Sequence, residues 1–323
     1  TPPTITANVA SMMEMGILRE CLPEKNEKNK KTLGRRPIKI EFIPDSYYAI
    51  GIETGPYRNS MCIVDLKGNI VSSLITAPSP ERYDEMVSKT ISEIQTLIDK
   101  SGLDSEKLLG AGIGLPGFVD GRNGIVRSSS HKDWNNRNLA KDIEKQSGLS
   151  VKIENNSRAR AIGLDLFNTL STDSFAYYFI SNGIACSLMI KNSMLSGETA
   201  GAGEAGHMVM DLNGPVCDIC GKKGCLDAIS SERAIRHQAA ESIQESKSTL
   251  LLDICKDPRH PSMEEILDAQ AKGDPLVCAI MENAITYLGI GLANIINLIS
   301  PHLVVVDGLM MSLEQNREKL AAI

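Results

Sequence analysis

A short stretch rich in glycine and cysteine, Gly201–Asp227, constrains this chain more than any other part of the sequence. It holds His207, Cys217, Cys220 and Cys225 within nineteen residues. Zinc binds imidazole and thiolate groups tetrahedrally, and glycines let a backbone turn tightly around an ion. The alternative is four unrelated residues, three of them cysteines buried as small apolar groups. Three cysteines within nine residues of a glycine-rich loop would make a poor core, so the pattern predicts a structural zinc site.

Two carboxylates flank this predicted zinc site. Glu204 lies three residues before His207, and Asp227 lies two residues after Cys225. A loop that folds around zinc brings both carboxylates toward the imidazole. Because carboxylates and imidazoles form hydrogen bonds with hydroxyl groups, the stretch also predicts a site for a polyhydroxylated ligand.

The same stretch resembles a known family. Its motifs GEAGH (203–207) and CGKKGCLD (220–227) are similar to GEIGH and CGxxGCLE of the ROK family of sugar kinases and sugar-responsive repressors. Two positions depart from that pattern: two residues rather than one separate Cys217 from Cys220, and Asp227 replaces a glutamate that contacts the sugar. The resemblance implies an α/β fold of the actin-like ATPase type, also called ribonuclease H-like, with two lobes.

The overall composition is that of an ordinary globular protein. The chain has 323 residues, of which 42% are hydrophobic and 23% charged, enough for two or three domains. No apolar run reaches the length of a membrane span and the start lacks a signal-peptide pattern, so we expect a cytoplasmic protein without a membrane partner. Eight cysteines in such a chain indicate a reducing compartment, and we expect packing roles for Cys21, Cys62, Cys186, Cys255 and Cys278.

Positive charge is concentrated near the start of the chain. The formal net charge is −6, yet residues 22–39 contain seven basic and only two acidic side chains. The basic residues are Lys25, Lys28, Lys30, Lys31, Arg35, Arg36 and Lys39. A basic stretch on an acidic protein predicts contact with a polyanion such as DNA, although a solvated loop has the same composition.

The segment before residue 44 predicts a helix followed by a basic hairpin. Pro2 suits the first turn of a helix, and Gly16 would end it. At helical spacing one face is apolar and the other small and polar, the two sets being Ile5, Val9, Met12 and Met13, and Thr4, Ala7, Asn8 and Ser11. Residues 17–20 and 38–43 predict two strands. A small polar face can enter a major groove, so Thr4, Asn8 and Ser11 are candidate base-reading residues.

This layout resembles the recognition helix and wing of ROK repressors, in which a similar helix precedes the motif GRRP. The matching segments here are Thr4–Leu18 and Gly34–Pro37. The resemblance implies a partial winged helix-turn-helix domain, because in the family two further helices precede the recognition helix. Arginines held between glycine and proline suit a narrow minor groove, so Arg35 and Arg36 are candidate DNA ligands. The alternative is an amphipathic helix followed by a disordered basic linker.

From residue 47 the pattern changes to short apolar runs that are typical of strands. Runs at 48–53, 61–66 and 69–75 predict a three-stranded meander. A helical pattern follows at about 79–100, and a further strand is expected at 110–117. This is the βββαβ unit that the resemblance implies, and the family repeats it in the second half of the chain. Near its end the sequence predicts a long apolar helical segment at 276–299 and a strand at 303–306.

Three segments that bind ATP in ROK kinases are altered in this chain. In the first hairpin Pro56 lacks an N–H donor and Tyr57 would occupy space that a phosphate needs. The second phosphate element, at 181–187, keeps one glycine where the family has three, and the adenosine motif at 306–309 also keeps one. We therefore predict no catalytic residues and no kinase activity.

The position of the family's general base is also changed. ROK kinases have END where this chain has residues 154–156, and Asn156 replaces the aspartate that accepts a proton from the sugar. Asn156 keeps hydrogen-bonding groups for a hydroxyl, and Asn155 matches a sugar-binding asparagine of the family. Gly114–Gly117 and Trp134 match segments that flank the family's sugar cleft, although a lone tryptophan is also typical of a core.

Together these patterns predict a partial winged helix domain at 1–43, an N-terminal actin-like lobe at 44–167, and a C-terminal actin-like lobe with the zinc loop at 168–323. The predicted function is a DNA-binding transcriptional regulator, a repressor of sugar metabolism genes that senses a sugar or sugar phosphate. We expect operator DNA as a partner and a homodimer or dimer of dimers. The alternatives are an ATP-dependent hexose kinase and a metal-stabilised interaction protein without a small-molecule ligand.

The predicted sites follow from the same argument. The sugar-binding residues are Asn155, Asn156, Glu204, His207 and Asp227. The zinc ligands are His207, Cys217, Cys220 and Cys225. The DNA-binding residues are Thr4, Asn8, Ser11, Arg35 and Arg36.

Overall fold

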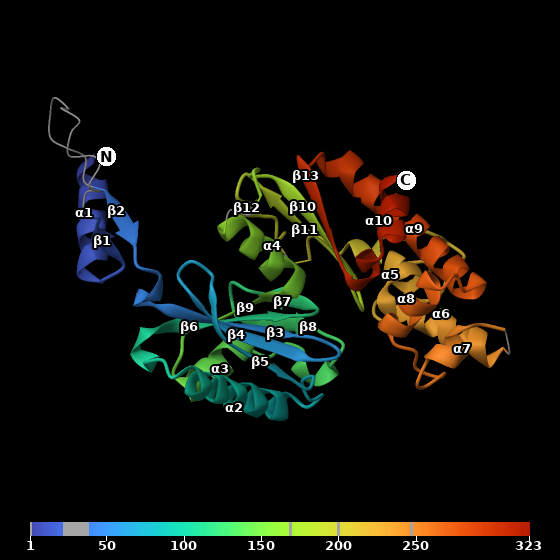
Figure 1. Cartoon of the computed structure of the whole chain (residues 1–323), viewed down its shortest axis with the longest axis horizontal. Coiled ribbons are helices and arrows are strands. Elements are labelled where there is room, and N and C mark those ends of the chain that lie inside the picture. The colour runs from blue at the N-terminus through green and yellow to red at the C-terminus, as the bar shows by residue number, and fades with distance from the viewer. Residues whose placement is uncertain (1, 22–38, 168–169, 199–200, 246–247) are drawn as a thin grey trace. The chain divides into compact units, whose positions relative to one another are not determined.

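Two compact units make up the chain, Thr1–Glu154 and Asn155–Ile323. The computed structural model (Figure 1) describes residues 2–21, 39–167, 170–198, 201–245 and 248–323. The division falls next to helix α4 (Asn156–Leu166), which packs against strands of the second unit. The predicted lobe boundary lies later, after residue 167, and the three predicted domain ranges stay a prediction.

A helix and a small hairpin open the first unit. Helix α1 (Pro2–Glu14) is followed by Gly16, whose φ of 72° is the left-handed conformation that ends many helices. Strands β1 (Leu18–Glu20) and β2 (Ile40–Phe42) pair antiparallel, with Arg19 opposite Glu41 and ion-paired to it. The predicted helix followed by a hairpin is confirmed. The basic residues between the two strands lie outside the described residues.

The apolar face of α1 is only partly covered. Val9 and Met13 are half-buried, but Ile5 is 65% exposed and Met12 is 41% exposed. The sequence predicted all four on one apolar face of the helix. Within the described part of the chain, β1 is the main neighbour of α1, and a strand of three residues is too short to cover a helix of this length.

The first unit is built on a five-stranded sheet of order β5-β4-β3-β6-β9. The first three strands form the predicted antiparallel meander, and β6 lies parallel to β3. The bounds are β3 Tyr48–Thr54, β4 Asn59–Asp65, β5 Ile70–Thr76, β6 Leu108–Leu115 and β9 Val151–Asn155. Helices α2 (Tyr83–Ser101) and α3 (Leu139–Ser147) pack together on one face of this sheet (Figure 1) and bury its core.

Helix α2 begins four residues later than the sequence predicted. Ser79 does not enter the helix, because its hydroxyl exchanges hydrogen bonds with the Asn59 side chain at the start of β4. Pro80 follows, and proline disfavours a helical conformation at the preceding residue. The helix therefore starts only at Tyr83, whose N–H donates to the Asp133 carboxylate at 2.8 Å.

Trp134 belongs to the core of the first unit. Its side chain is 2% exposed, and its indole N–H donates to the carbonyl of Glu81 at 3.0 Å. Burial with the indole N–H paired is the usual state of a core tryptophan. Nearby, β7 (Phe118–Asp120) and β8 (Ile125–Ser128) form a second small hairpin.

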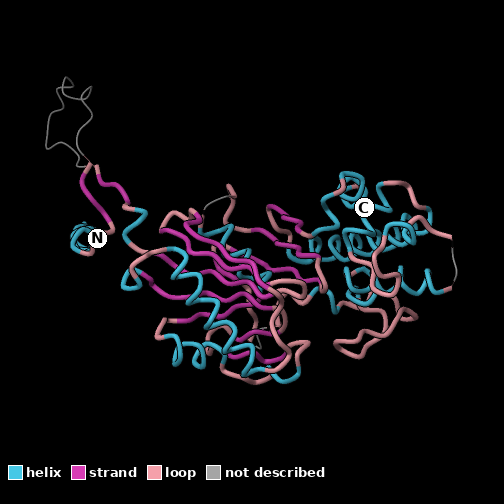
Figure 2. The backbone as a smooth tube through the Cα atoms, turned by 60° about the horizontal axis from the view of Figure 1, so that its bottom comes forward, coloured by secondary structure: helices cyan, strands magenta, loops and turns pink. Residues whose placement is uncertain are grey.

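The second unit is built on a four-stranded sheet of order β12-β11-β10-β13, whose strands are magenta in Figure 2. Strands β10, β11 and β12 are antiparallel neighbours, and β13 lies parallel to β10. This arrangement repeats the meander and parallel strand of the first unit, as predicted. The bounds are β10 Phe175–Ile180, β11 Ile184–Ile190, β12 Ser193–Met194 and β13 Leu303–Asp307.

Helices cover both faces of this sheet. Alternate residues of β10 face opposite sides, so Tyr178 and Ile180 pack under the C-terminal helices while Phe175 and Tyr177 pack under α4. The helices beyond the sheet are α5 Leu226–Ser230, α6 Glu232–Gln244, α7 Leu251–Ile254, α8 Met263–Ala271, α9 Pro275–Ile299 and α10 Glu314–Ala321. The larger core of the chain lies between these helices and the sheet.

Helix α9 is the longest helix of the described residues. By length and composition alone it could cross a bilayer, so the expectation that no apolar run is long enough was wrong. A core helix of a globular protein has the same composition. Nine residues of α9 are buried, and it packs against α5, α6, α8 and α10.

A buried carboxylate marks the start of α6. Glu232 is 3% exposed, and its backbone N–H donates to the carbonyl of Ser181 at 2.9 Å. Burial raises the pKa of Glu232 to about 7; the nearby Glu264 carboxylate adds to this rise, while a hydrogen bond from the Leu309 backbone and the Arg236 cation oppose it. The folded state therefore favours the neutral form of this acid.

This pKa predicts a pH dependence of stability. Since the pKa rises from 4.5 to about 7 on folding, the stabilisation from Glu232 is full below pH 4.5 and is lost as pH rises through 7. The variant Glu232→Gln should lack this loss, which amounts to at most about 1.4 kcal/mol per pH unit. Urea unfolding at several pH values measures it, with the exposed Glu318→Gln as control. Parallel profiles for wild type and Glu232→Gln would contradict the prediction.

Candidate functional site

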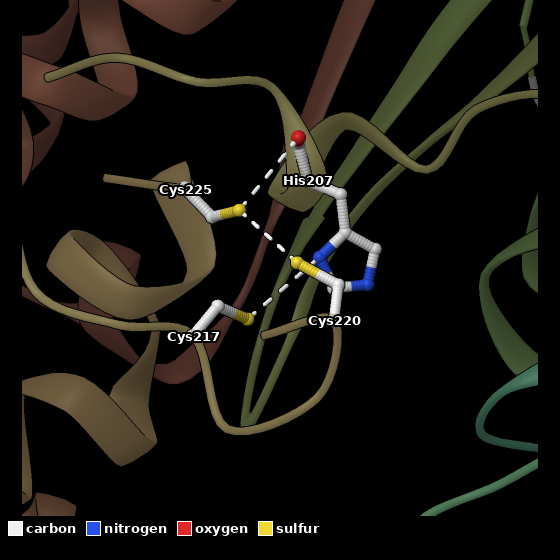
Figure 3. A group of neighbouring side chains, drawn as sticks. All are labelled: His207, Cys217, Cys220 and Cys225. Carbon is white, nitrogen blue, oxygen red and sulfur yellow. Dashed lines mark hydrogen bonds between the residues drawn. The ribbon is translucent and has the colours of Figure 1, made fainter. Parts of the chain in front are cut away.

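The four predicted zinc ligands converge in the second unit (Figure 3). The ligand atoms of His207, Cys217, Cys220 and Cys225 all lie within 4.8 Å of one another. The Cys217 Sγ to His207 Nδ1 distance is 3.9 Å, and the Cys220 Sγ to Cys225 Sγ distance is 3.3 Å. A tetrahedral zinc ion with Zn–S bonds of about 2.3 Å separates its sulfur ligands by roughly 3.8 Å. The four side chains therefore fit a tetrahedral metal ion such as zinc.

The ends of the loop that carries this cluster reach the apolar core at Ala205 and Leu226, but much of its middle does not. Four of its apolar side chains are exposed, namely Val209, Leu212, Val216 and Ile219. Backbone hydrogen bonds close the turn instead, since Cys217 N–H donates to Lys222 O and Gly221 N–H to Cys217 O, each at 2.8 Å. At Gly224 a Cβ would lie 1.5 Å from the carbonyl oxygen of Asp211, so only glycine fits there.

Glu204 connects the cysteine cluster to the start of α4. Its carbonyl accepts a hydrogen bond from His207 N–H at 3.1 Å, at the beginning of the short turn Ala205–His207. Burial raises the pKa of Glu204 to about 7; the Arg158 guanidinium opposes this rise and the Asp227 carboxylate adds to it. The charges of Arg158 and Asp227 therefore both act on the Glu204 carboxyl.

The two asparagines at the predicted sugar site lie at the beginning of α4. Asn155 is 7% exposed and caps the helix, since its Oδ1 accepts from the N–H groups of Ser157 at 3.0 Å and Arg158 at 3.3 Å. The Oδ1 of Asn156 also accepts from Ser157 N–H, at 2.9 Å. The helix start and the turn that carries His207 meet the same strand, since the Ser157 and Ser187 hydroxyls lie 2.7 Å apart and Cys186 N–H donates to Gly203 O at 2.7 Å.

Asp227 lies in the same neighbourhood but faces into the fold. Its side chain is 5% exposed, and Oδ1 accepts a hydrogen bond from Ile184 N–H at 2.7 Å. Burial raises the pKa of Asp227, whereas the Ile184 N–H, His207 and Arg233 lower it. Direct contact between Asp227 and a sugar stays a prediction.

Arg158 is a site residue that the sequence analysis missed. It is 3% exposed and lies in the first turn of α4 beside Glu204. The positive N-terminal end of a helix dipole disfavours a cation in the first turn. An arginine two residues after Asn156, in the first turn of the helix, could therefore have indicated a nearby carboxylate partner.

An open pocket of about 550 Å³ lies elsewhere in the second unit, between α4 and β13. Arg160, Tyr177 and Asp307 are its polar residues. The Asp307 carboxylate binds both others, accepting from Arg160 Nη1 at 2.9 Å and from the Tyr177 hydroxyl. Asp307 is therefore the centre of a local polar network.

Three of the predicted DNA-binding residues lie on one exposed face of α1. Thr4, Asn8 and Ser11 are all exposed, and spacings of four and three residues bring them to the same side of the helix. Arg35 and Arg36 lie outside the described residues, so their role stays a prediction.

Comparison with known proteins identifies one family. The ROK family pattern matches residues 49–322. A glucokinase of Thermotoga maritima is 30% identical over 261 residues, which cover 80% of this chain and 81% of the enzyme. The xylose repressor of Bacillus subtilis is 29% identical over 307 residues, which cover 94% of this chain and 73% of the repressor. The Escherichia coli transcriptional dual regulator NagC is 24% identical over 95% of this chain and 73% of its own length.

Solved structures agree with this family fold. A ROK family transcriptional regulator, a homologue of the E. coli MLC protein, superposes with a TM-score of 0.83 at 24% identity, over 100% of this chain and 80% of the regulator. A ROK glucokinase from Streptomyces griseus, in complex with glucose and AMPPNP, gives a TM-score of 0.74 at 24% identity, over 85% and 89% of the two chains. The fold predicted from the sequence is confirmed.

The cysteine cluster predicts bound metal. Freshly reduced protein should contain about one zinc ion per chain, and Cys220→Ser should contain less, because the shell loses a thiolate. Cys278→Ser, a change at a half-buried cysteine outside the cluster, is the matched control. Elemental analysis measures the zinc content. An equal content in both variants, or no zinc in wild type, would contradict the assignment.

Proposed function

Because the chain belongs to the ROK family, we propose that it is a DNA-binding transcriptional regulator, a repressor of sugar metabolism genes that senses a sugar or sugar phosphate. One observation carries this proposal. The xylose repressor and NagC match 94% and 95% of the chain, whereas the glucokinase matches 80%. The helix and hairpin of the first 43 residues precede the family pattern, which begins at residue 49. A regulator needs such a segment to bind DNA, whereas the phosphorylation of a sugar does not require it.

The DNA-binding part of the proposal rests on α1 and the hairpin. An exposed helix face with small polar side chains suits a major groove, where Thr4, Asn8 and Ser11 would contact base edges. The hairpin of β1 and β2 would be the wing of a winged helix, with Arg35 and Arg36 in the minor groove. Operator DNA is therefore the proposed macromolecular partner.

The sensor part of the proposal rests on the polar neighbourhood of the second unit. Asn155, Asn156, Glu204 and His207 would bind the hydroxyl groups of the sugar. Asp227 belongs to the same predicted set, but its carboxylate is bonded to Ile184 and would lie behind the residues that face the ligand. A structural zinc ion on His207 and the three cysteines would fix the turn that carries Glu204, because metal ligation orders a loop whose middle lacks an apolar core.

Sugar and DNA would be coupled by a population shift. A ligand that prefers one of two conformations moves the protein toward that conformation. In a homodimer or dimer of dimers, such a shift would change the spacing of the two recognition helices and so the fit to a palindromic operator. Such a regulator would act in the cytoplasm.

The rival function is an ATP-dependent sugar kinase, and similarity to the T. maritima glucokinase favours it. Asn156 argues against catalysis, since an amide cannot accept the proton of the attacking hydroxyl. Pro56 and Tyr57 remove a backbone donor and space from the first phosphate loop. Sugar-dependent release of ADP by wild-type protein would favour the kinase.

The proposed DNA contacts predict two different effects, one on overall DNA affinity and one on sequence preference. Replacing Arg35 and Arg36 by Ala should weaken binding to all sequences and reduce the salt dependence, by about one unit of slope per phosphate contact. Asn8→Ala should change sequence preference, by about 1 to 3 kcal/mol at one base pair. Fluorescence anisotropy with operator and scrambled DNA measures both. The same loss in all variants on both DNAs would contradict the assigned roles.

The sensor site predicts a sugar-dependent operator affinity. Glu204→Ala should abolish the response to sugar, because the carboxylate that binds the ligand is lost, and should leave binding without sugar unchanged. A thermal-shift screen of sugars and sugar phosphates selects the ligand, and anisotropy with and without it measures the response. Glu198→Ala, an exposed change in the same segment, is the control. Operator affinity that is constant up to saturating sugar would refute the proposed sensor.

A further inference from the structure

Asp227 connects three elements of the second unit. It lies in the first turn of α5, two residues after Cys225, and its Oδ1 accepts from Ile184 N–H at the start of β11. Its Oδ2 lies 3.7 Å from Nη2 of Arg233 on α6. The carboxylate therefore holds together the helix that follows the cysteine cluster, the β10–β11 turn and the start of α6.

The turn that carries Glu204 and His207 lies directly on this carboxylate. A Cβ at Gly206 would be 2.4 Å from Asp227 Oδ1 and 2.6 Å from the carbonyl oxygen of Ile184. Side-chain atoms do not approach this closely, so the backbone at residue 206 is in contact with the Asp227 side chain. The positions of Glu204 and His207 thus depend on where this carboxylate lies.

Gly183 also lies beside the Asp227 carboxylate, but a Cβ atom would fit there. A Cβ at Gly183 would be 3.5 Å from Oδ2, an ordinary van der Waals distance. The chain therefore offers two glycines around one carboxylate, of which Gly206 has no room for a methyl group and Gly183 has room.

We propose that Asp227 is a positioning residue, which sets the turn at 204–207 so that Glu204 and His207 face the ligand, and that it does not itself contact the sugar. This inference deepens the proposed sensor function and rests on it. An aspartate reaches one methylene less far than a glutamate, and both of its oxygens already have partners within the fold. Sugar selectivity would then be determined by Asn155, Asn156, Glu204 and His207.

A positioning role and a direct contact predict different selectivity. If Asp227 only positions the turn, Asp227→Asn should weaken the binding of all sugars by a similar factor, about 10- to 100-fold, the range found for residues that support metal ligands. If Asp227 binds one hydroxyl group, the loss should vanish for sugars that lack or invert that hydroxyl. Asparagine keeps the size of the side chain and an acceptor oxygen for Ile184 N–H, so the fold should be retained.

The experiment compares wild type with Asp227→Asn, Gly206→Ala and Gly183→Ala. The probes are D-xylose, D-glucose and N-acetyl-D-glucosamine, each with its epimers and deoxy forms, measured by calorimetry. We expect a uniform loss for Asp227→Asn and Gly206→Ala and no loss for Gly183→Ala. A loss confined to one hydroxyl position in Asp227→Asn, or an equal loss in both glycine variants, would overturn the proposal.

A second measurement needs no sugar. Zinc-loaded proteins are challenged with a colorimetric chelator, and the rate of zinc release is recorded. Release should be faster by roughly tenfold or more in Asp227→Asn and Gly206→Ala, because the ligand His207 adjoins Gly206, and unchanged in Gly183→Ala. Equal rates in all four proteins would overturn the positioning role. If zinc release differs among the variants as expected but no sugar binds, only the proposed sensor function is refuted.

Discussion

The convergence of four side chains on one point organises the second unit. The loop from Gly201 to Asp227 exposes most of its larger apolar side chains, so burial of apolar surface cannot determine its shape. The ligand atoms of one histidine and three cysteines within 4.8 Å of one another can do so. The turn with Glu204 ends at the cluster residue His207, and α5 with Asp227 begins directly after the cluster residue Cys225. A hydrogen-bonding site for sugars needs this order, since hydroxyl groups are distinguished by the direction of their partners.

Local patterns in the sequence determined much of the fold correctly. The antiparallel meander, the hairpin of β1 and β2, and the end of α1 at Gly16 all depend on residues close in sequence, and all are confirmed. The parallel pairing of β13 with β10 spans more than a hundred residues, and only the resemblance to a two-lobe family could predict it. The late start of α2 depends partly on Pro80, which is visible in the sequence, and partly on a contact between Ser79 and Asn59, which is not.

The candidate site, too, was predictable only where its residues lie close together in the sequence. The metal cluster is visible in the sequence because its four ligands lie within one loop. The direction of the Asp227 carboxylate is not visible in the sequence, since its hydrogen-bond donor is the backbone of Ile184, 43 residues earlier in the chain. Family resemblance suggested that a carboxylate at this position faces the sugar. In this chain the shorter aspartate accepts a hydrogen bond from Ile184 N–H.

The position of Trp134 makes the two units separately observable. It is the single tryptophan of the chain, and it is buried in the first unit, with its indole N–H bonded to Glu81. Intrinsic tryptophan fluorescence therefore reports on the packing of that unit alone, whereas the metal cluster belongs to the second unit. Tryptophan emission and the release of the proposed zinc ion, followed in the same denaturation experiment, would show whether the units melt in one transition or in two. Trp134 thus provides an intrinsic fluorescence label for the first unit.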